Sequence, residues 1–353
     1  MSSVLPSFRS VSQSARKIVV VDLGFLGDAV QLVPVCWEIK RNWPEAELHT
    51  LSAPVGAALL GLTSCVNKTW AFPLGPQSPP WWRHWNILLA LRRERFDLAV
   101  NFSGADRTIF VTALTGARWR AAHQGGRQHF WNRWLIPQWV SRVQSDQLVC
   151  EQRRQVLAAL GCELGPTRFD LSIPPPDAAW ANETIPAGAI HLSVSASSPF
   201  KEWPLEHWIL LASELARTTG HTLIATSGSS PREIEKLRAL VSSPVGRQIH
   251  IFPGNLTIAR LAAVLTRCRL HIGVDSGTTH VAFALKVPTL TIFRDYPDRV
   301  EWTPNSPRDR QLVAPPCACL RVSQPLCSQA QRAHCLGEIS PASVARLAAE
   351  MLR

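Results

Sequence analysis

The sequence lacks any long hydrophobic run. Its apolar stretches are soon interrupted by charge, proline or glycine, and none reaches the roughly 18–20 residues that span a bilayer. This excludes a transmembrane helix. Residues 1–16 are serine-rich and carry Arg9 and Arg16, but no apolar signal core follows them. We therefore expect a disordered tail over 1–16 and a cytoplasmic protein.

Charged residues are also few, at 18% of the chain, whereas hydrophobic residues make up 46%. This balance excludes a disordered, collagenous or coiled-coil protein. With 353 residues, the chain is too long for one ordinary core and suits two domains.

The nine cysteines lack the pattern of a secreted disulfide framework. Four of them follow the late pattern C-x-C-x7-C-x7-C, and four thiolates can bind zinc, but the usual C-x2-C pairs are missing. A structural metal, passive structural cysteines and a reactive role all remain open for Cys317, Cys319, Cys327 and Cys335.

Positive charge dominates, with 37 Lys and Arg against 26 Asp and Glu, a net charge of +11 and a pI near 9.7. Arginines outnumber acidic residues between Arg83 and Arg133. Such a field suits nucleic acid, phosphorylated sugars or an anionic membrane, although arginine-rich composition also arises from genome bias. The sequence has no helix-turn-helix, zinc-finger or RNP motif, so charge alone suggests nucleic acid.

Strand and helix patterns alternate in both halves. The apolar run 17–23 predicts a buried parallel strand, 27–43 has helical spacing, and 96–102 predicts another strand. A proline-rich stretch over 165–186 predicts the domain boundary, after which the pattern restarts. We expect an α/β fold of two Rossmann-like doubly wound domains facing a cleft, with ligands beyond the carboxyl ends of the strands.

The first motif is D-L-G-F-L-G-D-A, from Asp22 to Ala29, at a strand-to-helix turn. It matches neither the G-x-G-x-x-G dinucleotide fingerprint nor a Walker loop. Asp28 lies at the predicted helix start, where an Asp usually acts as a cap that stabilises by about 1 kcal/mol. A carboxylate at the cleft can also act as a general base, and both interpretations stay open.

Two further motifs follow strands of the second half. The segment Ser193–Pro204 combines four serines with Lys201, which suits a diphosphate cradle or an ordinary polar loop. The segment His271–His280 places Asp275 and Ser276 before a helix, where they can supply hydrogen-bond donors to phosphate and hydrogen-bond acceptors for ribose hydroxyls. Asp275 as a simple cap and His280 as a packed core residue are the alternatives.

In order and spacing, three segments resemble the lipopolysaccharide heptosyltransferases of glycosyltransferase family nine. They are L-G-D at 26–28, F-K-E-W-P-L-E-H-W at 200–208 and G-V-D-S-G-T-T-H-V-A at 273–282. The resemblance covers roughly residues 17–352. It implies a glycosyltransferase-B fold and inverting transfer of heptose from ADP-heptose, with no metal or cofactor required. It also implies an acceptor-binding domain over 17–170 and a nucleotide-sugar-binding domain over 171–338.

The remaining segment, 339–353, is predicted to be a C-terminal helix, with Ser340 as its N-cap and Pro341 at its first position. Packing of this helix on the N-terminal domain is one option.

The same resemblance implies roles for individual residues. Asp28 would deprotonate the acceptor hydroxyl, and Lys201 would neutralise the departing diphosphate. Four groups complete the implied site: Ser195 and Ser197 beside the diphosphate; Asp275, Ser276, Gly277 and His280 along the nucleotide sugar; Gly27 beside the base; and Arg107, Arg120 and Arg127 on the acceptor side.

The implied acceptor is an anionic lipid-linked oligosaccharide, which would bring the enzyme to the inner face of the cytoplasmic membrane as a peripheral protein without nucleic-acid partners. Trp residues between 81 and 134 stack on sugars or sit at membrane interfaces, or else pack in the core. We expect a Trp and Arg surface there on the acceptor side.

Two departures from the family pattern concern the donor and acceptor loops. Gly24 and Phe25 stand where Ser is common, and F-R-D-Y-P-D-R at 293–299 replaces a Gly-Pro-Thr type turn. The second change leaves another nucleotide sugar or glycan acceptor open. A non-catalytic protein that binds a sugar nucleotide or nucleic acid is the alternative of another class.

Overall fold

The computed structural model describes residues 8–73, 81–124, 129–141, 146–316, 327 and 333–353. Contacts divide the chain into two compact units, Met1–Ser172 and Ile173–Arg353. Each unit contains a six-stranded sheet in which all neighbouring strands run parallel. The predicted α/β fold with two doubly wound domains is confirmed.

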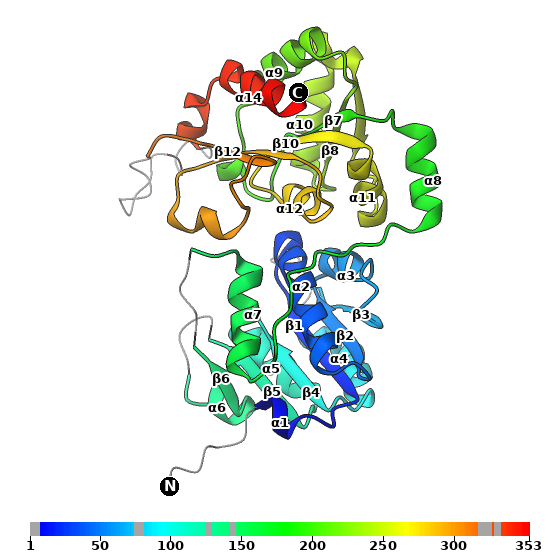
Figure 1. Ribbon diagram of the computed structural model, residues 1–353, viewed down its shortest axis with the longest axis vertical. Helices are drawn as coiled ribbons and strands as arrows, with labels where there is room; N and C mark the ends of the chain where they lie inside the picture. Colours follow the sequence, from blue (N-terminus) through cyan, green and yellow to red (C-terminus); the bar gives the residue numbers. More distant parts are fainter. Residues whose placement is uncertain (1–7, 74–80, 125–128, 142–145, 317–326, 328–332) are drawn as a thin grey trace. The chain divides into compact units, whose positions relative to one another are not determined.

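The sheet of the first unit has the order β3-β2-β1-β4-β5-β6 (Figure 1). The chain enters at the middle and winds outward in both directions, so the order reverses between β1 and β4. Every residue of β1 after Lys17 is buried, as expected for a parallel strand covered on both faces. The strands are β1 (Lys17–Asp22), β2 (Glu47–Ser52), β3 (Lys68–Ala71), β4 (Leu98–Asn101), β5 (Trp119–His123) and β6 (Gln138–Val140).

Helices connect these strands. The longest, α2, buries Val30, Val33 and Ile39, which the helical spacing predicted, and packs against α3 and α7. The helices of this unit are α1 (Phe8–Val11), α2 (Leu26–Asn42), α3 (Pro54–Leu60), the 3-10 helix η1 (Trp81–His84), α4 (Trp85–Arg93), α5 (Asp106–Leu114), α6 (Asn132–Leu135) and α7 (Val149–Ala159).

The predicted disordered tail over 1–16 is too long. Residues 8–16 are ordered: the Arg9 amide donates to the Leu160 carbonyl at 2.9 Å, and the Trp43 indole donates to the Ser12 carbonyl at 2.9 Å. Both Ser12 and Trp43 are buried, so this segment covers part of the first core. Residues 1–7 lie outside the described part of the chain.

The sheet of the second unit has the order β12-β11-β10-β7-β8-β9, which is the same topology with its reversal between β7 and β10. Its core includes Trp203 and Trp208, whose rings meet edge to face at 5.1 Å. The strands are β7 (Ala189–Ser193), β8 (Leu223–Ser227), β9 (Ile249–Pro253), β10 (Cys268–Val274), β11 (Thr289–Phe293) and β12 (Asp309–Val313).

The closing helix α14 (Pro341–Leu352) starts as the sequence predicts, because the Ser340 hydroxyl accepts from the Ser343 amide. It packs against α9 and β10, so it belongs to the second core. The other helices are α8 (Pro175–Thr184), α9 (Leu205–Thr218), α10 (Pro231–Val241), α11 (Ile258–Thr266), α12 (Gly277–Ala284) and the 3-10 helices η2 (Pro199–Lys201), η3 (Pro244–Gln248), η4 (Pro297–Glu301) and η6 (His334–Glu338).

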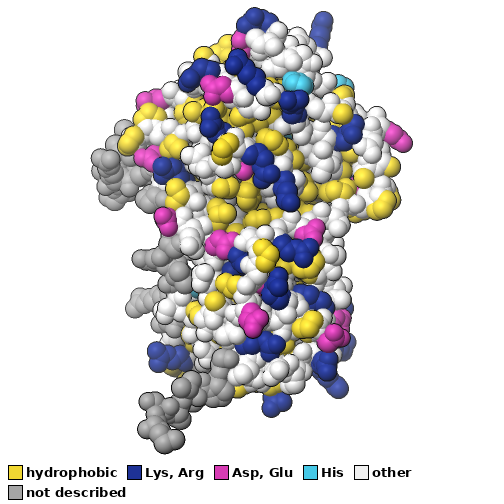
Figure 2. All heavy atoms as spheres, viewed as in Figure 1, with side chains coloured by type: hydrophobic (Ala, Val, Ile, Leu, Met, Phe, Trp, Pro, Cys, Tyr) yellow, Lys and Arg dark blue, Asp and Glu magenta, His cyan; other side chains and the backbone are white. Residues whose placement is uncertain are grey.

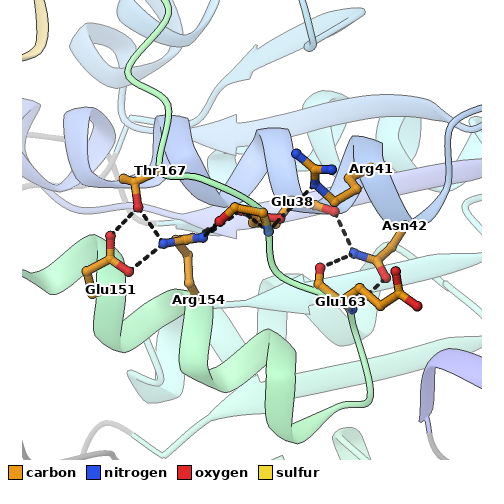
Figure 3. A network of polar contacts seen from close by, with 8 residues as sticks. Glu38, Arg41, Asn42, Glu151, Arg154, Glu163 and Thr167 are labelled. Atoms are coloured by element: carbon orange, nitrogen blue, oxygen red, sulfur yellow. Dashed lines mark hydrogen bonds and ion pairs between the residues drawn. The ribbon is translucent and has the colours of Figure 1, made fainter.

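The proline-rich stretch 165–186 is only partly a linker, because Pro175 occupies the first turn of α8, where its missing N–H costs nothing. Before α8, the segment 163–167 is tied to the first unit by the polar network of Figure 3. Arg154 of α7 pairs with Glu38 of α2 at 2.9 Å and also contacts Thr167. Both partners of that pair are buried.

Figure 2 shows Lys and Arg side chains spread over the visible face and fewer acidic ones, as the net charge of +11 requires. Within the described residues, no helix is long and apolar enough to cross a membrane.

Candidate functional site

The predicted motifs follow the strands that flank the two reversals of strand order. Asp22–Asp28 follows β1 in the first sheet. In the second sheet, Ser193–Lys201 follows β7 and Asp275 follows β10. Ligands of open parallel sheets bind at such points, outside the carboxyl ends of the strands. Each unit therefore presents one candidate site.

Asp28 is the third residue of α2, and its contacts are compatible with both roles considered for it, the helix cap and the general base. Its Oδ2 accepts a hydrogen bond from the Phe25 amide at 2.9 Å, so it does cap the helix. Its Oδ1 lies 3.3 Å from Nη2 of Arg153, and the side chain stays 25% exposed. A carboxylate that is held in place and still reaches solvent is placed to accept a proton from a bound hydroxyl.

One partner of Asp28, Arg153, lacked a signal in the sequence. The Arg153 guanidinium, from α7, lies 2.6 Å from Oδ2 of Asp22 and also donates to the Asp28 carbonyl at 2.8 Å. Burial raises the pKa of Asp22, and the neighbouring Asp28 charge adds to this, while Arg153 opposes it. Asp22 is only 3% exposed, so Asp28 is the carboxylate that a substrate can reach.

Gly24, one of the residues that depart from the family pattern, lies against the side chain of Asp28. A Cβ at this position would lie 2.5 Å from the Asp28 carboxyl carbon, which is closer than atoms can approach. The Gly24 amide also donates to Oδ1 of Asp22 at 2.8 Å. The absence of a side chain at Gly24 therefore leaves room for the carboxylate of Asp28.

In the second unit, the structure brings three of the candidate residues, Lys201, Asp275 and His280, together. Nζ of Lys201 lies 2.7 Å from Oδ2 of Asp275, and Nε2 of His280 lies 3.7 Å from Oδ1. Burial alone would raise the pKa of Asp275, but the contacts with His280 and Lys201 outweigh it and hold that pKa below its usual range. Asp275 is therefore a buried anion that keeps the half-exposed Lys201 ammonium at the strand end.

Tyr296 is a further member of this cluster that sequence reasoning missed. Its hydroxyl donates to the same Asp275 Oδ2 at 2.7 Å. Tyr296 lies in the run 293–299 that departs from the family turn, and this departure was the available signal. Burial, reinforced by the Asp275 carboxylate, raises the pKa of Tyr296 well above its usual range.

The serines are distributed differently from the prediction. Ser276 occupies the N-cap position of α12 next to Gly277 without a side-chain capping hydrogen bond, and its hydroxyl lies 3.4 Å from those of Ser193 and Thr279. The buried Ser195 instead donates to Glu233 at 3.2 Å, so its hydroxyl is engaged away from Lys201. Ser197 is exposed.

The motif residue after Lys201 holds the loop in place. One oxygen of Glu202 accepts from the Ala196 amide at 3.0 Å, and the other lies 3.0 Å from Nζ of Lys236 in α10. Trp203 then enters the core, and its indole donates to the Ile339 carbonyl at 3.1 Å. The run K-E-W thus combines a solvent-facing cation with two structural anchors.

The acceptor-side arginines divide into three cases. Arg107 is exposed on the first turn of α5, which follows β4 at the reversal of the first sheet. The Arg120 guanidinium is used in hydrogen bonds to the backbone, because it donates to the Leu135 and Ala117 carbonyls at 2.7 and 2.6 Å. Arg127 lies outside the described residues. Arg120 is therefore better explained as a brace between β5 and α6 than as an acceptor ligand.

The late cysteine pattern cannot be assembled from the described residues. Cys335 is buried against the second core and Cys327 is also buried, but Cys317 and Cys319 lie outside the described part. The metal site stays a prediction. No group of three or more metal-binding side chains is present among the described residues.

The comparisons with known proteins agree with this geometry. The model of glycosyltransferase family 9 (heptosyltransferase) matches residues 84–329, which is more than half of the chain. The chain therefore belongs to this family and is a glycosyltransferase.

Individual relatives are distant in sequence but close in fold. Lipopolysaccharide heptosyltransferase 3 of Escherichia coli is 23% identical over 294 residues, which cover 79% of this chain and 84% of that protein. The solved family 9 glycosyl transferase of Veillonella parvula superposes with a TM-score of 0.74 at 18% identity, covering 96% of this chain and 97% of its own. E. coli heptosyltransferase WaaC with ADP-2-deoxy-2-fluoro heptose gives 0.71 at 18%, covering 95% and 99%.

Proposed function

We propose that this enzyme is an inverting, metal-independent heptosyltransferase that moves heptose from ADP-heptose to a lipopolysaccharide inner-core acceptor. Relatives named lipopolysaccharide heptosyltransferases and a similar structure with an ADP-heptose analogue support the donor and the acceptor class. The proposal depends on one observation in each unit: an anchored carboxylate that reaches solvent at Asp28 in the first, and an anchored cation at Lys201 in the second.

In the proposed reaction, the first unit binds the acceptor and the second binds the donor. The acceptor oxygen attacks the anomeric carbon of the sugar, and its proton passes to Asp28. The bond from that carbon to the diphosphate oxygen breaks, and the electron pair leaves with ADP. Lys201 and the N–H groups at the start of α12 stabilise the developing negative charge, which is a role that a metal ion fills in other transferases.

A second donor remains a specific alternative because of Tyr296. The Tyr296 hydroxyl donates a hydrogen bond to Asp275 from a segment that departs from the family turn. This contact changes the surroundings of the Asp275 carboxylate, which we place on the donor side. The same fold and reaction with another nucleotide sugar or glycan acceptor would then apply. Calorimetric binding of ADP, UDP and TDP to the full chain separates the two, because preference for UDP or TDP would overturn the ADP-heptose assignment.

Mutation tests the division of roles. Asp28→Asn should lower kcat by about 10²–10⁴-fold, because the proposed proton acceptor is lost, and should leave ADP affinity unchanged, because the donor residues lie in the other unit. Lys201→Ala should weaken ADP binding by about tenfold, since it removes a charge-assisted contact to phosphate. The exposed Asp146→Asn is the matched control for loss of one negative charge.

The wild-type rate in Asp28→Asn would contradict the general-base role. Activity that disappears with a chelator and returns with a divalent ion would contradict metal independence. A product that keeps the anomeric configuration of the donor, as read by NMR, would contradict inversion.

A further inference from the structure

A line of hydrogen-bonded side chains crosses the interior of the second unit from β8 to α12. His191 on β7 and His271 on β10 are register partners, and their Nδ1 atoms lie 2.8 Å apart. Nε2 of His191 lies 3.0 Å from the Thr226 hydroxyl on β8, and Nε2 of His271 lies 3.0 Å from the Thr279 hydroxyl on α12. We call these four side chains the histidine chain. Each is at most 4% exposed, so its polar atoms depend on one another for partners.

The last link fixes the direction of every other link. The Thr279 hydroxyl donates its one hydrogen to the Val274 carbonyl at 2.7 Å, so its oxygen must accept from Nε2 of His271. Burial lowers the pKa of both rings and keeps them neutral, with one donating and one accepting nitrogen each. Nδ1 of His271 therefore accepts from Nδ1 of His191, and Nε2 of His191 accepts from Thr226.

The opposite direction is excluded by the contact at Val274. If the Thr279 hydroxyl donated to His271 instead, Oγ1 of Thr279 and the Val274 carbonyl oxygen would face each other at 2.7 Å with no hydrogen between them. Two buried acceptors at that separation repel each other, and neither would have a donor in place of the lost one. Only one arrangement of protons thus satisfies the whole chain.

Gly273 provides the space for the link between β10 and α12. A Cβ at this position would lie 2.6 Å from Nε2 of His271 and 2.8 Å from Oγ1 of Thr279, which is closer than atoms can approach. Any side chain at Gly273 would therefore push these two atoms apart. The glycine of the motif at 273–282 and the histidine two residues before it form one arrangement.

The histidine chain ends at the turn that carries Asp275. Thr279 is the third residue of α12, and its bond to the Val274 carbonyl ties the helix to the last residue of β10. Asp275 and Ser276 lie between these two points, and the Asp275 carboxylate holds Lys201. The N–H groups at the start of α12, which the proposed reaction uses, belong to the same turn.

We propose that His271 is a positioning residue for the donor site. Through Thr279 it fixes the turn 274–279, and with it the Asp275 carboxylate and the first N–H groups of α12 that would meet the donor diphosphate. His191 and Thr226 hold the His271 ring in the tautomer that this role needs, because the hydrogen bond at one ring nitrogen determines which nitrogen carries the proton. The inference rests on the proposed function, since it takes the end of β10 as part of the donor site.

Transfer of a proton along the histidine chain is the other role that such a line of groups suggests. The chain ends on one side at the Val274 carbonyl oxygen, which has no proton to pass on. On the other side it ends at Thr226, which is 4% exposed. The histidine chain therefore orients groups and does not carry protons to a ligand.

NMR of the full chain with isotope-labelled histidine tests the direction of the bonds. Nε2 of His271 and Nδ1 of His191 should each carry a hydrogen, and the other nitrogen of each ring should show the shift of a free lone pair. This pattern should persist with ADP bound. The opposite tautomer in either ring overturns the proposal.

Calorimetric binding of ADP tests the positioning role. Thr279→Val removes the hydroxyl at nearly constant volume and should weaken ADP binding by about fivefold or more. Thr279→Ser keeps the hydroxyl and should stay within about twofold of the wild type. Thr291→Val is the matched control and should bind ADP as the wild type does. Thr291 is also buried in the second unit, and its hydroxyl has no hydrogen-bond partner among the described residues.

His271→Gln and His271→Asn separate the two nitrogens of the ring. The side-chain amide of Gln reaches the place of Nε2 and can donate to Thr279, whereas the shorter Asn reaches only the place of Nδ1. The Gln variant should therefore keep more ADP affinity than the Asn variant. Equal loss in the two folded variants overturns the role of Nε2.

Urea unfolding measures stability separately from binding. A Thr279→Val protein that is less stable but binds ADP as the wild type does overturns the positioning role, and so does an equal loss of affinity in Thr291→Val. A wild type that fails to bind ADP overturns the proposed donor and not this inference. The backbone amide signals of Ser276 and Gly277 then decide, because they should shift in Thr279→Val and not in Thr291→Val. Unchanged signals in Thr279→Val overturn the inference.

Discussion

Asp275 is contacted by three side chains from separate parts of the second unit. Lys201 and Tyr296 share its Oδ2, and His280 approaches Oδ1. A buried carboxylate is costly unless it is paired and hydrogen-bonded, and here these partners satisfy it. The same contacts place Lys201 at the carboxyl end of the sheet, so the stability of Asp275 and the position of the proposed diphosphate ligand are coupled.

Tyr296 is the only tyrosine of the chain, so tyrosinate absorbance reports on it alone. Because burial and the Asp275 carboxylate both disfavour the phenolate, the folded protein should show no half-ionisation near the usual pKa of about 10. Asp275→Asn removes the nearby charge and should lower the pKa of Tyr296, as measured by spectrophotometric titration below the unfolding pH. Asp298→Asn is the control for a smaller contribution. Half-ionisation near pH 10 in the folded wild type would contradict the contact.

At the scale of elements, the segment 163–167 is held by hydrogen bonds around a buried ion pair. Glu38 of α2 pairs with Arg154 of α7 and accepts from the Gly165 amide at 3.0 Å, while Asn42 accepts from the Glu163 amide at 2.9 Å (Figure 3). The network thus fixes the chain where it leaves the first unit.

Arg154→Met should lower the free energy of unfolding by about 3–5 kcal/mol, because it leaves Glu38 buried with a missing partner. Replacing both members, with Glu38→Gln and Arg154→Met, should cost less than the single change. Urea unfolding measures both. Arg168→Met, which breaks the half-exposed pair with Asp170, is the control and should stay within about 1 kcal/mol of the wild type. A double variant less stable than Arg154→Met would contradict this account.

At the scale of the whole molecule, two buried histidines make the second unit sensitive to acid. His191 and His271 lie on neighbouring strands β7 and β10, with their Nδ1 atoms 2.8 Å apart. Burial lowers the pKa of His191 to about 3, and burial together with His191 lowers that of His271 well below its usual value. One of these Nδ1 atoms must donate and the other accept, so at least the accepting ring must be neutral.

Because both pKa values are lower in the folded state, the unfolded chain binds more protons once the pH falls below about 6.5. Stability is therefore full above that pH and is lost progressively down to about pH 3. Between pH 6.5 and 5.0 the free energy of unfolding should therefore fall as the pH is lowered.

Hydrogen exchange of the β10 amides, followed over the same series of pH values in the wild type and the variants, measures this loss of stability in the second unit. The double variant His191→Asn with His271→Asn should show a shallower pH dependence, whereas His221→Asn, outside the pair, should keep the wild-type slope. Equal slopes in all three proteins would contradict the assignment.

Much of this protein could be predicted from local pattern. Apolar runs such as 17–23 and helical spacing over 27–43 define the buried strand and the packed face of α2, since burial follows period and composition. Ser340 and Pro341 mark the start of α14 because capping is a local interaction. The strand-end motifs of Asp28, Lys201 and Asp275 could be found for the same reason, and their chemical roles remain predictions.

Only the tertiary structure decided the contacts between distant segments. It joins Arg153 to Asp22 and Asp28, joins Tyr296 to Asp275, and diverts Ser195 to Glu233. It also turns Arg120 into a backbone brace and leaves Phe130 and Trp134 in solvent. Such pairings depend on which strand ends become neighbours when the sheet forms, and side-chain type and spacing along the chain do not contain that information.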